Sequence, residues 1–458
     1  MRLGPVRRAS NDAAVREARP QGAGRWYPAA VFALSLIVTL GFWHFAPFGA
    51  MRNESSDYAH FYEPVARQIL AGHGVVRPDG SPAARYPPGF PALLAGAFAV
   101  AAFLRVPETV ALGGLNAVGL AISSVLLYAI AKRVWHPRAA LLAAAAWMTY
   151  PLSLWFTKQP NSEIPFLVFV YGAYLFLANA LWREQGRQGF AFAGGVLAGG
   201  AMLIRPIGVG LGLLMAAAIL FTLRGRERPG RWRAAGLVLL GNLIVVMPWE
   251  IWLSAQTGKL VPLSTGGVMS VRDGLTFAQQ TQDLPADVAA LARDIRTRYK
   301  DLRTLPAIGN LLMEEIQARP AAVMKLLAIK AVRSWYGTES RRREPVILAI
   351  QACYLVLIVC CAAAAVRRGG RPRQLAFLVG ATGLYFWGMA FLTLSIVRYL
   401  VPAVGLLFLV LPVLVPRSES RPVPIGDSSG PVPVTGPGLK DRAPGGRGLE
   451  FARPSGFE

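Results

Sequence analysis

Residues 109–131 have the sequence TVALGGLNAVGLAISSVLLYAIA, which contains no charged side chain. A helix needs roughly 20 consecutive apolar residues to cross the hydrocarbon core of a bilayer, and this stretch is long enough to do so. The basic residues Lys132 and Arg133 follow it directly. We therefore expect a membrane-spanning helix that ends at a positively charged loop.

Other stretches of the chain are similarly apolar. They cover residues 28–48, 89–104, 139–156, 163–182, 189–204, 207–223, 235–253, 345–366, 374–397 and 399–415. The whole chain of 458 residues is 54% hydrophobic and 16% charged, whereas a soluble globular protein carries about 25% charged residues. This composition excludes a water-soluble enzyme and predicts an all-α polytopic membrane protein, a bundle of about 10–11 transmembrane helices.

The net charge of +23 comes mainly from basic residues in the loops between apolar stretches. The four clusters are Lys132, Arg133 and Arg138; Arg183 and Arg187; Arg224, Arg226, Arg228, Arg231 and Arg233; and Arg367, Arg368, Arg371 and Arg373. Cytoplasmic loops of membrane proteins are enriched in Lys and Arg, so we expect all four clusters in the cytoplasm. The charge therefore indicates membrane orientation, and we expect membrane lipids and no nucleic acid as partners.

If every apolar stretch crossed the membrane, there would be one crossing too many before the basic clusters, and they would lie outside. Stretch 89–104 resolves the conflict, because it has only 16 residues, contains Pro91 and follows the turn Tyr86-Pro87-Pro88. We predict that it lies in the outer interface or re-enters it, which leaves about ten spans. Residues 49–108 then form a first outer loop and residues 254–344 a long outer loop.

The predicted organisation has three parts. Residues 1–27 form a cytoplasmic basic N-terminus before a retained anchor, residues 28–416 form the transmembrane domain, and residues 417–458 form a disordered cytoplasmic tail rich in Pro, Gly and Ser. Within the outer loops, residues 57–71 and 283–335 have the amphipathic pattern of surface helices.

The first outer loop carries two polar features. Asp57 opens the amphipathic helix that also contains His60 and Tyr62, and Arg85-Tyr86 precedes a double proline. Each feature has a structural explanation, because Asp is a common helix N-cap and a double proline makes a rigid turn. A substrate-binding role for these residues is the alternative explanation, and the sequence pattern alone leaves both open.

Three basic residues fall on the outer side, where the orientation rule disfavours them. They are Lys158, Arg205 and Arg398, each at the end of an apolar stretch. Ionisable groups at membrane depth are costly unless partnered, so these residues are functional candidates, with snorkelling at a span end as the alternative. Glu163 begins a span on the same side, where the helix dipole also favours an acid.

Taken together, these elements resemble the GT-C membrane glycosyltransferases, and within them the group of protein O-mannosyltransferases and aminoarabinose transferases. The elements are Asp57, Tyr86-Pro87-Pro88, Arg205-Pro206, Pro248-Trp249 and Arg398-Tyr399, spread over residues 28–415. The aminoarabinose transferases carry a Lys before the double proline, where this chain has Tyr86. The resemblance therefore indicates a class of enzyme and leaves the sugar and the acceptor open.

The resemblance implies a transferase that moves a sugar from a polyprenyl-phosphate donor to a lipid, glycan or protein acceptor on the extracytoplasmic face of the cell membrane. Such a donor is consistent with the chain, which lacks the Gly-rich phosphate loops of nucleotide-binding proteins. Asp57 is then the catalytic carboxylate, assisted by Glu163. Arg205, Arg398 and Lys158 would bind the donor phosphate, since Arg pairs well with phosphate.

The remaining assignments concern substrate and cofactor. His60, Tyr62, Arg85 and Tyr86 are candidate substrate-binding residues, and a divalent cation held by Asp57 and Glu163 is the one cofactor that we consider. The sequence predicts no dedicated metal site. A polytopic transporter or flippase of lipids or small molecules is the alternative function, although the polar residues lie at span ends and show no two-fold repeat of the kind found in transporters.

Overall fold

The computed structural model describes residues 24–46, 57–183, 185–223, 228–277, 284–339, 341 and 343–416. The predicted tail 417–458 and most of the basic N-terminus lie outside the described residues. Regular structure in the described ranges is helical, apart from one isolated β-bridge between Val76 and Pro82. The predicted all-α architecture is confirmed.

Every predicted apolar stretch coincides with a helix or a pair of short helices. The long ones are α1 (Tyr27–Phe45), α3 (Gly89–Leu104), α4 (Glu108–Ala131), α7 (Glu163–Trp182), α8 (Arg187–Ile204), α10 (Arg228–Thr257), α15 (Glu344–Arg368) and α16 (Gly370–Leu392). The shorter ones are α5 (Pro137–Met148), α6 (Pro151–Thr157), η3 (Pro206–Gly208), α9 (Leu211–Thr222), η5 (Val397–Tyr399), α17 (Val401–Leu407) and η6 (Phe408–Leu414).

Six of the described helices are long and apolar enough to cross a membrane unaided, and a seventh span is formed if the bent pair α5 and α6 is counted as one. The segments 89–104, 206–222 and 401–414 are apolar but shorter. The prediction of about 10–11 crossings therefore includes several segments that do not meet this criterion alone. The multi-pass character of the chain does not depend on them.

The stretch predicted as one helix over residues 139–156 is broken. The helices α5 and α6 meet at an angle of 57°, and Tyr150, between them, has an extended backbone. Pro151 causes the break, since a proline disfavours helical geometry in the residue before it and donates no backbone hydrogen bond.

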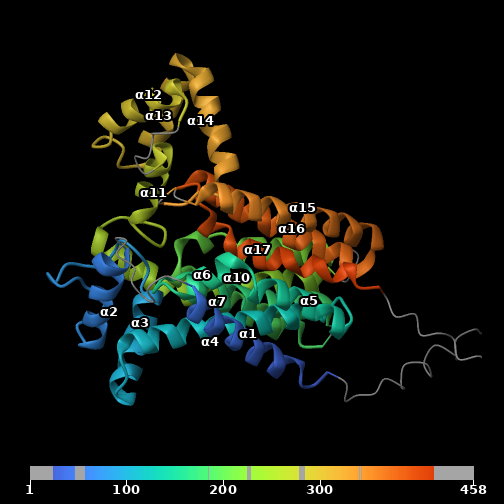
Figure 1. The fold of residues 1–458 in the computed structure, drawn as a ribbon. Helices are drawn as coiled ribbons and strands as arrows, with labels where there is room; N and C mark the ends of the chain where they lie inside the picture. Colours follow the sequence, from blue (N-terminus) through green and yellow to red (C-terminus); the bar gives the residue numbers. More distant parts are fainter. Residues whose placement is uncertain are drawn as a thin grey trace, which may run out of the picture. The chain divides into compact units, whose positions relative to one another are not determined.

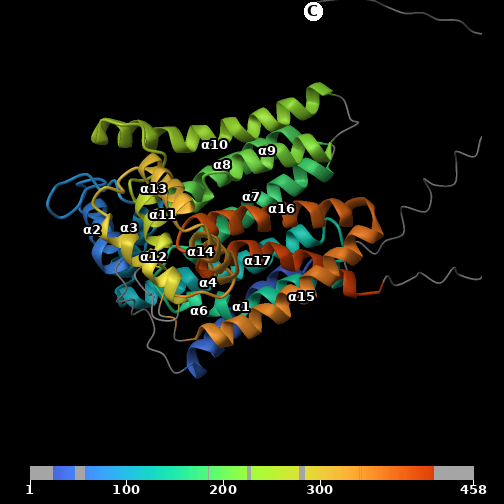
Figure 2. The same ribbon diagram turned by 90° about the horizontal axis from the view of Figure 1, so that it is seen from above.

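The bundle is packed most closely around α8. Figure 2 shows α10, α8 and α7 side by side, with α15 on the opposite flank. The backbones of α8 and α10 touch at glycines: a Cβ at Gly195 would lie 2.1 Å from the carbonyl oxygen of Val238, and one at Gly241 would lie 2.4 Å from that of Phe192. Small residues permit such close helix contacts in membranes.

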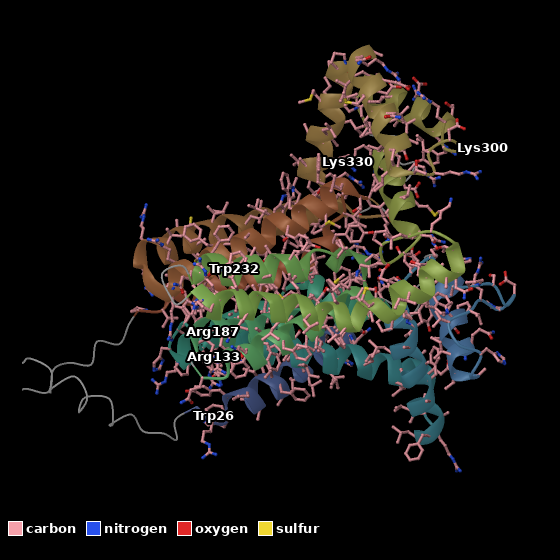
Figure 3. The ribbon with its side chains drawn as sticks, turned by 180° about the vertical axis from the view of Figure 1, so that it is seen from behind. Trp26, Arg133, Arg187, Trp232, Lys300 and Lys330 are labelled. Atoms are coloured by element: carbon pink, nitrogen blue, oxygen red, sulfur yellow. The ribbon has the colours of Figure 1, made fainter. Side chains whose placement is uncertain are left out.

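The basic loops gather at one end of the bundle. Arg133, Arg187 and Trp232 lie at this end together with Trp26, which precedes α1, whereas Lys300 and Lys330 lie away from it, in the part that rises above the bundle in this view (Figure 3). Arg371 belongs to the same end, because its guanidinium donates to the carbonyl oxygens of Arg133 and Trp182. The helix α3 lies away from the basic end and runs across the direction of the long helices (Figure 1).

The amphipathic helix of the first outer loop begins as a π-helix. The segment η2 (Tyr58–Tyr62) leads into α2 (Glu63–Leu70), and Gly72 with φ +81° follows its end. Tyr62 and Val65 are buried, as the predicted apolar stripe requires. The sequence pattern does not distinguish the wide turn of the π-helix from an ordinary helix, since both place these residues on one face.

The long outer loop folds into a cap with its own apolar core. Its helices are α11 (Gly266–Leu275), α12 (Ala286–Thr297), α13 (Leu305–Ala318) and α14 (Pro320–Arg333). Phe277, Leu291, Ile308 and Leu326 are among the buried residues that these helices share. The amphipathic faces predicted for residues 283–335 thus pack mainly on one another. We call residues 266–333 the cap.

Lys330 joins the cap to the bundle and was not predicted from the sequence. The side chain is only 2% exposed, and its Nζ donates to the carbonyl oxygens of Gly274, at 2.9 Å, and Thr393, at 2.6 Å. Burial lowers the pKa of Lys330 to about 7, and the charge of Arg333 acts in the same direction.

This environment gives a testable pH dependence. Between pH about 7 and about 10.4 the folded state holds Lys330 neutral while the unfolded state binds a proton, so the free energy of unfolding rises with pH in this window. We expect Lys330→Met to remove this rise, measured as detergent melting temperature against pH. Lys325→Met, on the exposed face of the same helix, is the control; a wild-type slope in Lys330→Met would contradict the assignment.

Candidate active site

Asp57 lies at the entrance to η2 and makes no capping hydrogen bond to the helix. Instead its Oδ1 accepts a hydrogen bond of 3.0 Å from the hydroxyl of Tyr86, and the Arg85 guanidinium lies 3.8 Å from the same oxygen. The carboxylate remains 29% exposed. The N-cap explanation for this Asp therefore fails, and the structure brings Asp57, Arg85 and Tyr86 together as one group.

Aromatic side chains hold Tyr86 in place beneath the carboxylate. Its ring lies 5.2 Å from that of Tyr62 and 5.1 Å from that of Phe61, while Tyr62 packs edge-on against Phe90. Burial raises the pKa of the Tyr86 hydroxyl, and the negative charge of Asp57 raises it further. The phenol therefore stays protonated and donates its hydrogen bond to Asp57.

The turn that carries Arg85 and Tyr86 is positioned by the segment after α10. The backbone N–H groups of Thr265 and Gly266 donate to the carbonyl oxygens of Ala84 and Arg85. That segment is itself fixed by α10, because the Trp249 indole donates to the carbonyl oxygen of Leu263 at 2.8 Å. Trp249 is buried, so the Pro248-Trp249 pair supports the site from inside the protein.

Glu163 lies at the centre of a second group, deep in the protein. Its carboxylate forms ion pairs with the guanidiniums of Arg205 and of Arg398, the latter with Nε at 2.8 Å. The Glu163 side chain is 3% exposed and those of Arg205 and Arg398 are 9% and 19% exposed. Both arginines also lie over the ring of Tyr399. They point inward, so the snorkelling explanation does not apply to them.

The two groups are adjacent. Gly89, which ends the Tyr86-Pro87-Pro88 turn, rests on the end of α8 just before Arg205: a Cβ at this position would lie 2.6 Å from the carbonyl oxygen of Leu203. The Tyr62 hydroxyl lies between them, close enough to feel the charges of Asp57, Arg205 and Arg398. The structure thus brings the predicted Asp and both predicted Arg residues into one region.

The contact at Gly89 predicts a large effect of a small substitution. Gly89→Ala places a methyl group against backbone atoms that have little freedom to retreat, so the turn must shift relative to Arg205. We expect this variant to retain its fold but to lose activity by about tenfold or more, because misplacing reacting groups by even 1 Å can cost about 100-fold. Gly96→Ala on α3, where a Cβ meets no atom within 4 Å, is the matched control; equal activity of the two variants would contradict the prediction.

A groove of about 820 Å³ opens beside the second group. Its apolar walls come from α1, α6 and α15, including Phe42, Trp155 and Ile347. Its polar lining includes Gln159, Asn161, Glu339, Arg343 and Arg398. The groove therefore combines largely apolar walls with a cationic side chain, Arg398, that belongs to the candidate site. Glu339 and Arg343 were missed because the sequence gives no sign that this part of the loop returns to the first span.

Lys158 and His60 are the remaining predicted residues. The Lys158 ammonium donates to the carbonyl oxygen of Ala46 at 3.1 Å, just beyond the end of α1, and the side chain is buried. His60 lines a separate pocket of about 240 Å³, together with Arg77 and Asp79. Neither contact joins these residues to the ion pairs around Glu163.

A family model matches part of the sequence, and solved structures with a similar fold were found. A family model described as dolichyl-phosphate-mannose-protein mannosyltransferase matches residues 85–252, which contain Tyr86, Glu163, Arg205 and Trp249. No curated protein sequence matches the chain. The oligosaccharyltransferase AglB from Archaeoglobus fulgidus, in complex with an inhibitory peptide and a dolichol-phosphate, has a TM-score of 0.52 and 12% identity over 84% of this chain and 50% of its own.

This chain has the GT-C fold. The Archaeoglobus fulgidus oligosaccharyltransferase in complex with Zn and sulfate gives a TM-score of 0.53 with 15% identity, covering 83% of this chain and 48% of that one. ArnT from Cupriavidus metallidurans bound to undecaprenyl phosphate gives 0.40 with 16% identity over 84% and 77%. The chain spans about half the length of the Archaeoglobus proteins that it matches.

Proposed function

We propose that this protein is a membrane glycosyltransferase that moves a sugar from a polyprenyl-phosphate donor to an acceptor. The observation that carries the proposal is the groove: its lining is largely apolar and includes Arg398, which belongs to the ion-paired group next to Asp57. A lipid-linked sugar has this same sequence of chemistry, with an apolar tail, then a phosphate, then the sugar. The GT-C fold and the mannosyltransferase family match support this function over a transporter.

In this proposal Arg205 and Arg398 bind the donor phosphate. Guanidiniums form strong, often bidentate hydrogen bonds to phosphate oxygens, and these two are fixed by Glu163 between them. Glu163 then acts as a positioning residue that sets the spacing of the two cations. The apolar walls of the groove receive the first part of the polyprenyl chain.

Asp57 orients the acceptor and takes its proton as the new glycosidic bond forms. Glycosyl transfer passes through an oxocarbenium-like state, in which a well-placed carboxylate assists the incoming hydroxyl. A carboxylate is a weak base, so the contribution of Asp57 comes from its position and from late proton transfer. Tyr86 fixes the position of the carboxylate. Arg85, with 46% of its side chain exposed, is accessible to an acceptor beside Asp57.

A divalent cation held by Asp57 and Glu163 does not suit the described residues. Glu163 already faces two guanidiniums, so a divalent cation beside it would be repelled. No group of three His, Cys, Asp or Glu side chains among the residues that the structure describes is arranged to hold a metal ion. The proposal therefore assigns neutralisation of the phosphate to the arginines. The roles of Lys158 and His60 stay predictions from the sequence.

We also propose that the site faces the extracytoplasmic side. Arg205 follows the end of α8 that is opposite to Arg187, and Arg187 lies with the other basic loops (Figure 3). If those loops are cytoplasmic, the site, the first outer loop and the cap are outside.

Cysteine labelling checks this orientation. In a chain whose three native cysteines are replaced by Ser, a cysteine at position 134 should react with a membrane-impermeant maleimide from the cytoplasmic side. One at position 260, where Leu260 is 82% exposed beyond α10, should react from the outside. The reverse pattern would refute the orientation while leaving the enzymatic proposal intact.

Transfer of label is the test of the function itself. The purified protein is reconstituted in vesicles with radiolabelled polyprenyl-phosphate sugars and with lipid, glycan or peptide acceptors. We expect label to pass from the donor to one class of acceptor, and Asp57→Asn to abolish the transfer. Movement of intact donor across the bilayer without transfer would instead establish the transporter function.

A further inference from the structure

Two glutamate carboxylates form ion pairs with Arg398, and they differ in how far they are exposed to solvent. Glu163 meets its Nε at 2.8 Å and is 3% exposed. Glu339 meets its Nη1 at 2.5 Å and is 48% exposed. Glu163 is also held by Arg205. One carboxylate is therefore a fixed part of the site, whereas the other lies at the surface of the groove.

The backbone before Glu339 is fixed independently of this ion pair. Val397 donates its N–H to the carbonyl oxygen of Gly337 at 2.9 Å, and Thr338 donates its N–H to the Glu344 carboxylate at 2.8 Å. The backbone that leads into Glu339 is therefore held by contacts other than its ion pair with Arg398. Both Glu339 and Arg398 line the groove, so the space beside this ion pair belongs to it.

We propose that the Glu339 carboxylate occupies the phosphate position on Arg398 when the groove holds no lipid, and that it exchanges with the lipid phosphate in each catalytic cycle. The inference rests on the proposed function and adds a regulatory role for a residue outside the catalytic group. Glu339 thereby weakens the binding of every lipid phosphate, and its return to Arg398 assists release of the spent carrier.

The charges of donor and product explain why such exchange matters. A polyprenyl-phosphate sugar is a phosphodiester with one negative charge, whereas the polyprenyl phosphate left after transfer is a monoester with a charge of about −1.5 to −2. Two arginines therefore hold the product more strongly than the substrate. A competing carboxylate at the same cation offsets part of this difference, since it is available as soon as the product begins to leave.

The test compares Glu339→Gln with wild type. We expect the affinity for undecaprenyl phosphate in nanodiscs to rise about fivefold, the scale of a partly exposed ion pair. Single-turnover transfer should keep its rate, whereas steady-state turnover should fall and product inhibition should strengthen. Glu339→Asp keeps the charge and should restore most of the wild-type behaviour. Glu314→Gln is the matched control, because it breaks an exposed Arg–Glu pair in the cap.

Two outcomes separate this inference from the proposed function. If Arg398→Ala weakens binding of undecaprenyl phosphate while Glu339→Gln leaves affinity and product inhibition unchanged, the exchange is refuted and the donor site stands. If Arg398→Ala has wild-type affinity, the donor site itself is wrong. A lower affinity in Glu339→Gln would also overturn the inference, since it would make Glu339 a support for the phosphate and not its competitor.

Discussion

Asp57→Asn is expected to reduce sugar transfer by about 100-fold or more, the range that general acid–base groups contribute. Asn has nearly the same size and still accepts the hydrogen bond from Tyr86, but it has no negative charge with which to take the acceptor's proton. Because Asp57 makes no capping hydrogen bond, the melting temperature in detergent should stay close to that of wild type. The measurement is initial transfer rate together with thermal stability.

Two companion variants make this result interpretable. Asp57→Ala should be as inactive as Asp57→Asn but less stable, because it leaves the buried Tyr86 hydroxyl without its acceptor, which costs about 1 kcal/mol or more. Tyr86→Phe removes only the hydrogen bond that orients the carboxylate, so its loss of activity should be smaller, about tenfold. Near-normal turnover of Asp57→Asn would end the catalytic assignment.

The apolar stretches of the sequence predicted the helices well, because a helix that lies in a bilayer needs apolar side chains along most of its length. The bounds of α3 and α7 agree with the predicted stretches 89–104 and 163–182. The break at Pro151 was missed because the residues on both sides of it are equally apolar. The cap core was missed because residues on an amphipathic helix look the same whether they face a membrane or a neighbouring helix.

The charged residues of the site were predicted individually, but their partners were not. Arg205 and Arg398 attracted attention because a cation on the outer side of a membrane protein is unusual, and Glu163 because it was the only acid near them in its loop. Nothing in the sequence shows that residues so far apart in the chain meet in one ion-paired group. The importance of Gly89 could not be predicted from the sequence, because it depends on the close approach of the Leu203 backbone in the folded protein.

The ion-paired group gives the second large expected effect. Arg398→Ala should weaken donor use by about 30-fold, because loss of a charged hydrogen bond to a partly desolvated phosphate costs about 2 kcal/mol. Its stability should fall only moderately, since Arg205 still neutralises Glu163. Arg205→Ala should weaken donor use similarly but should also lower stability more, because Arg205 is the more deeply buried of the two cations.

Removing both members of the Glu163–Arg205 ion pair separates the role of Arg205 in stability from its role in phosphate binding. The double variant Glu163→Gln with Arg205→Gln removes the buried carboxylate together with the cation nearest to it. We therefore expect most of the stability lost in Arg205→Ala to return. Donor affinity should not return, because one of the two phosphate-binding guanidiniums is still missing. The measurements are the apparent affinity for the lipid donor and the detergent melting temperature of each variant. Recovery of donor affinity together with stability would mean that Arg205 serves the fold alone, and wild-type affinity in both single Arg variants would remove the phosphate from this site.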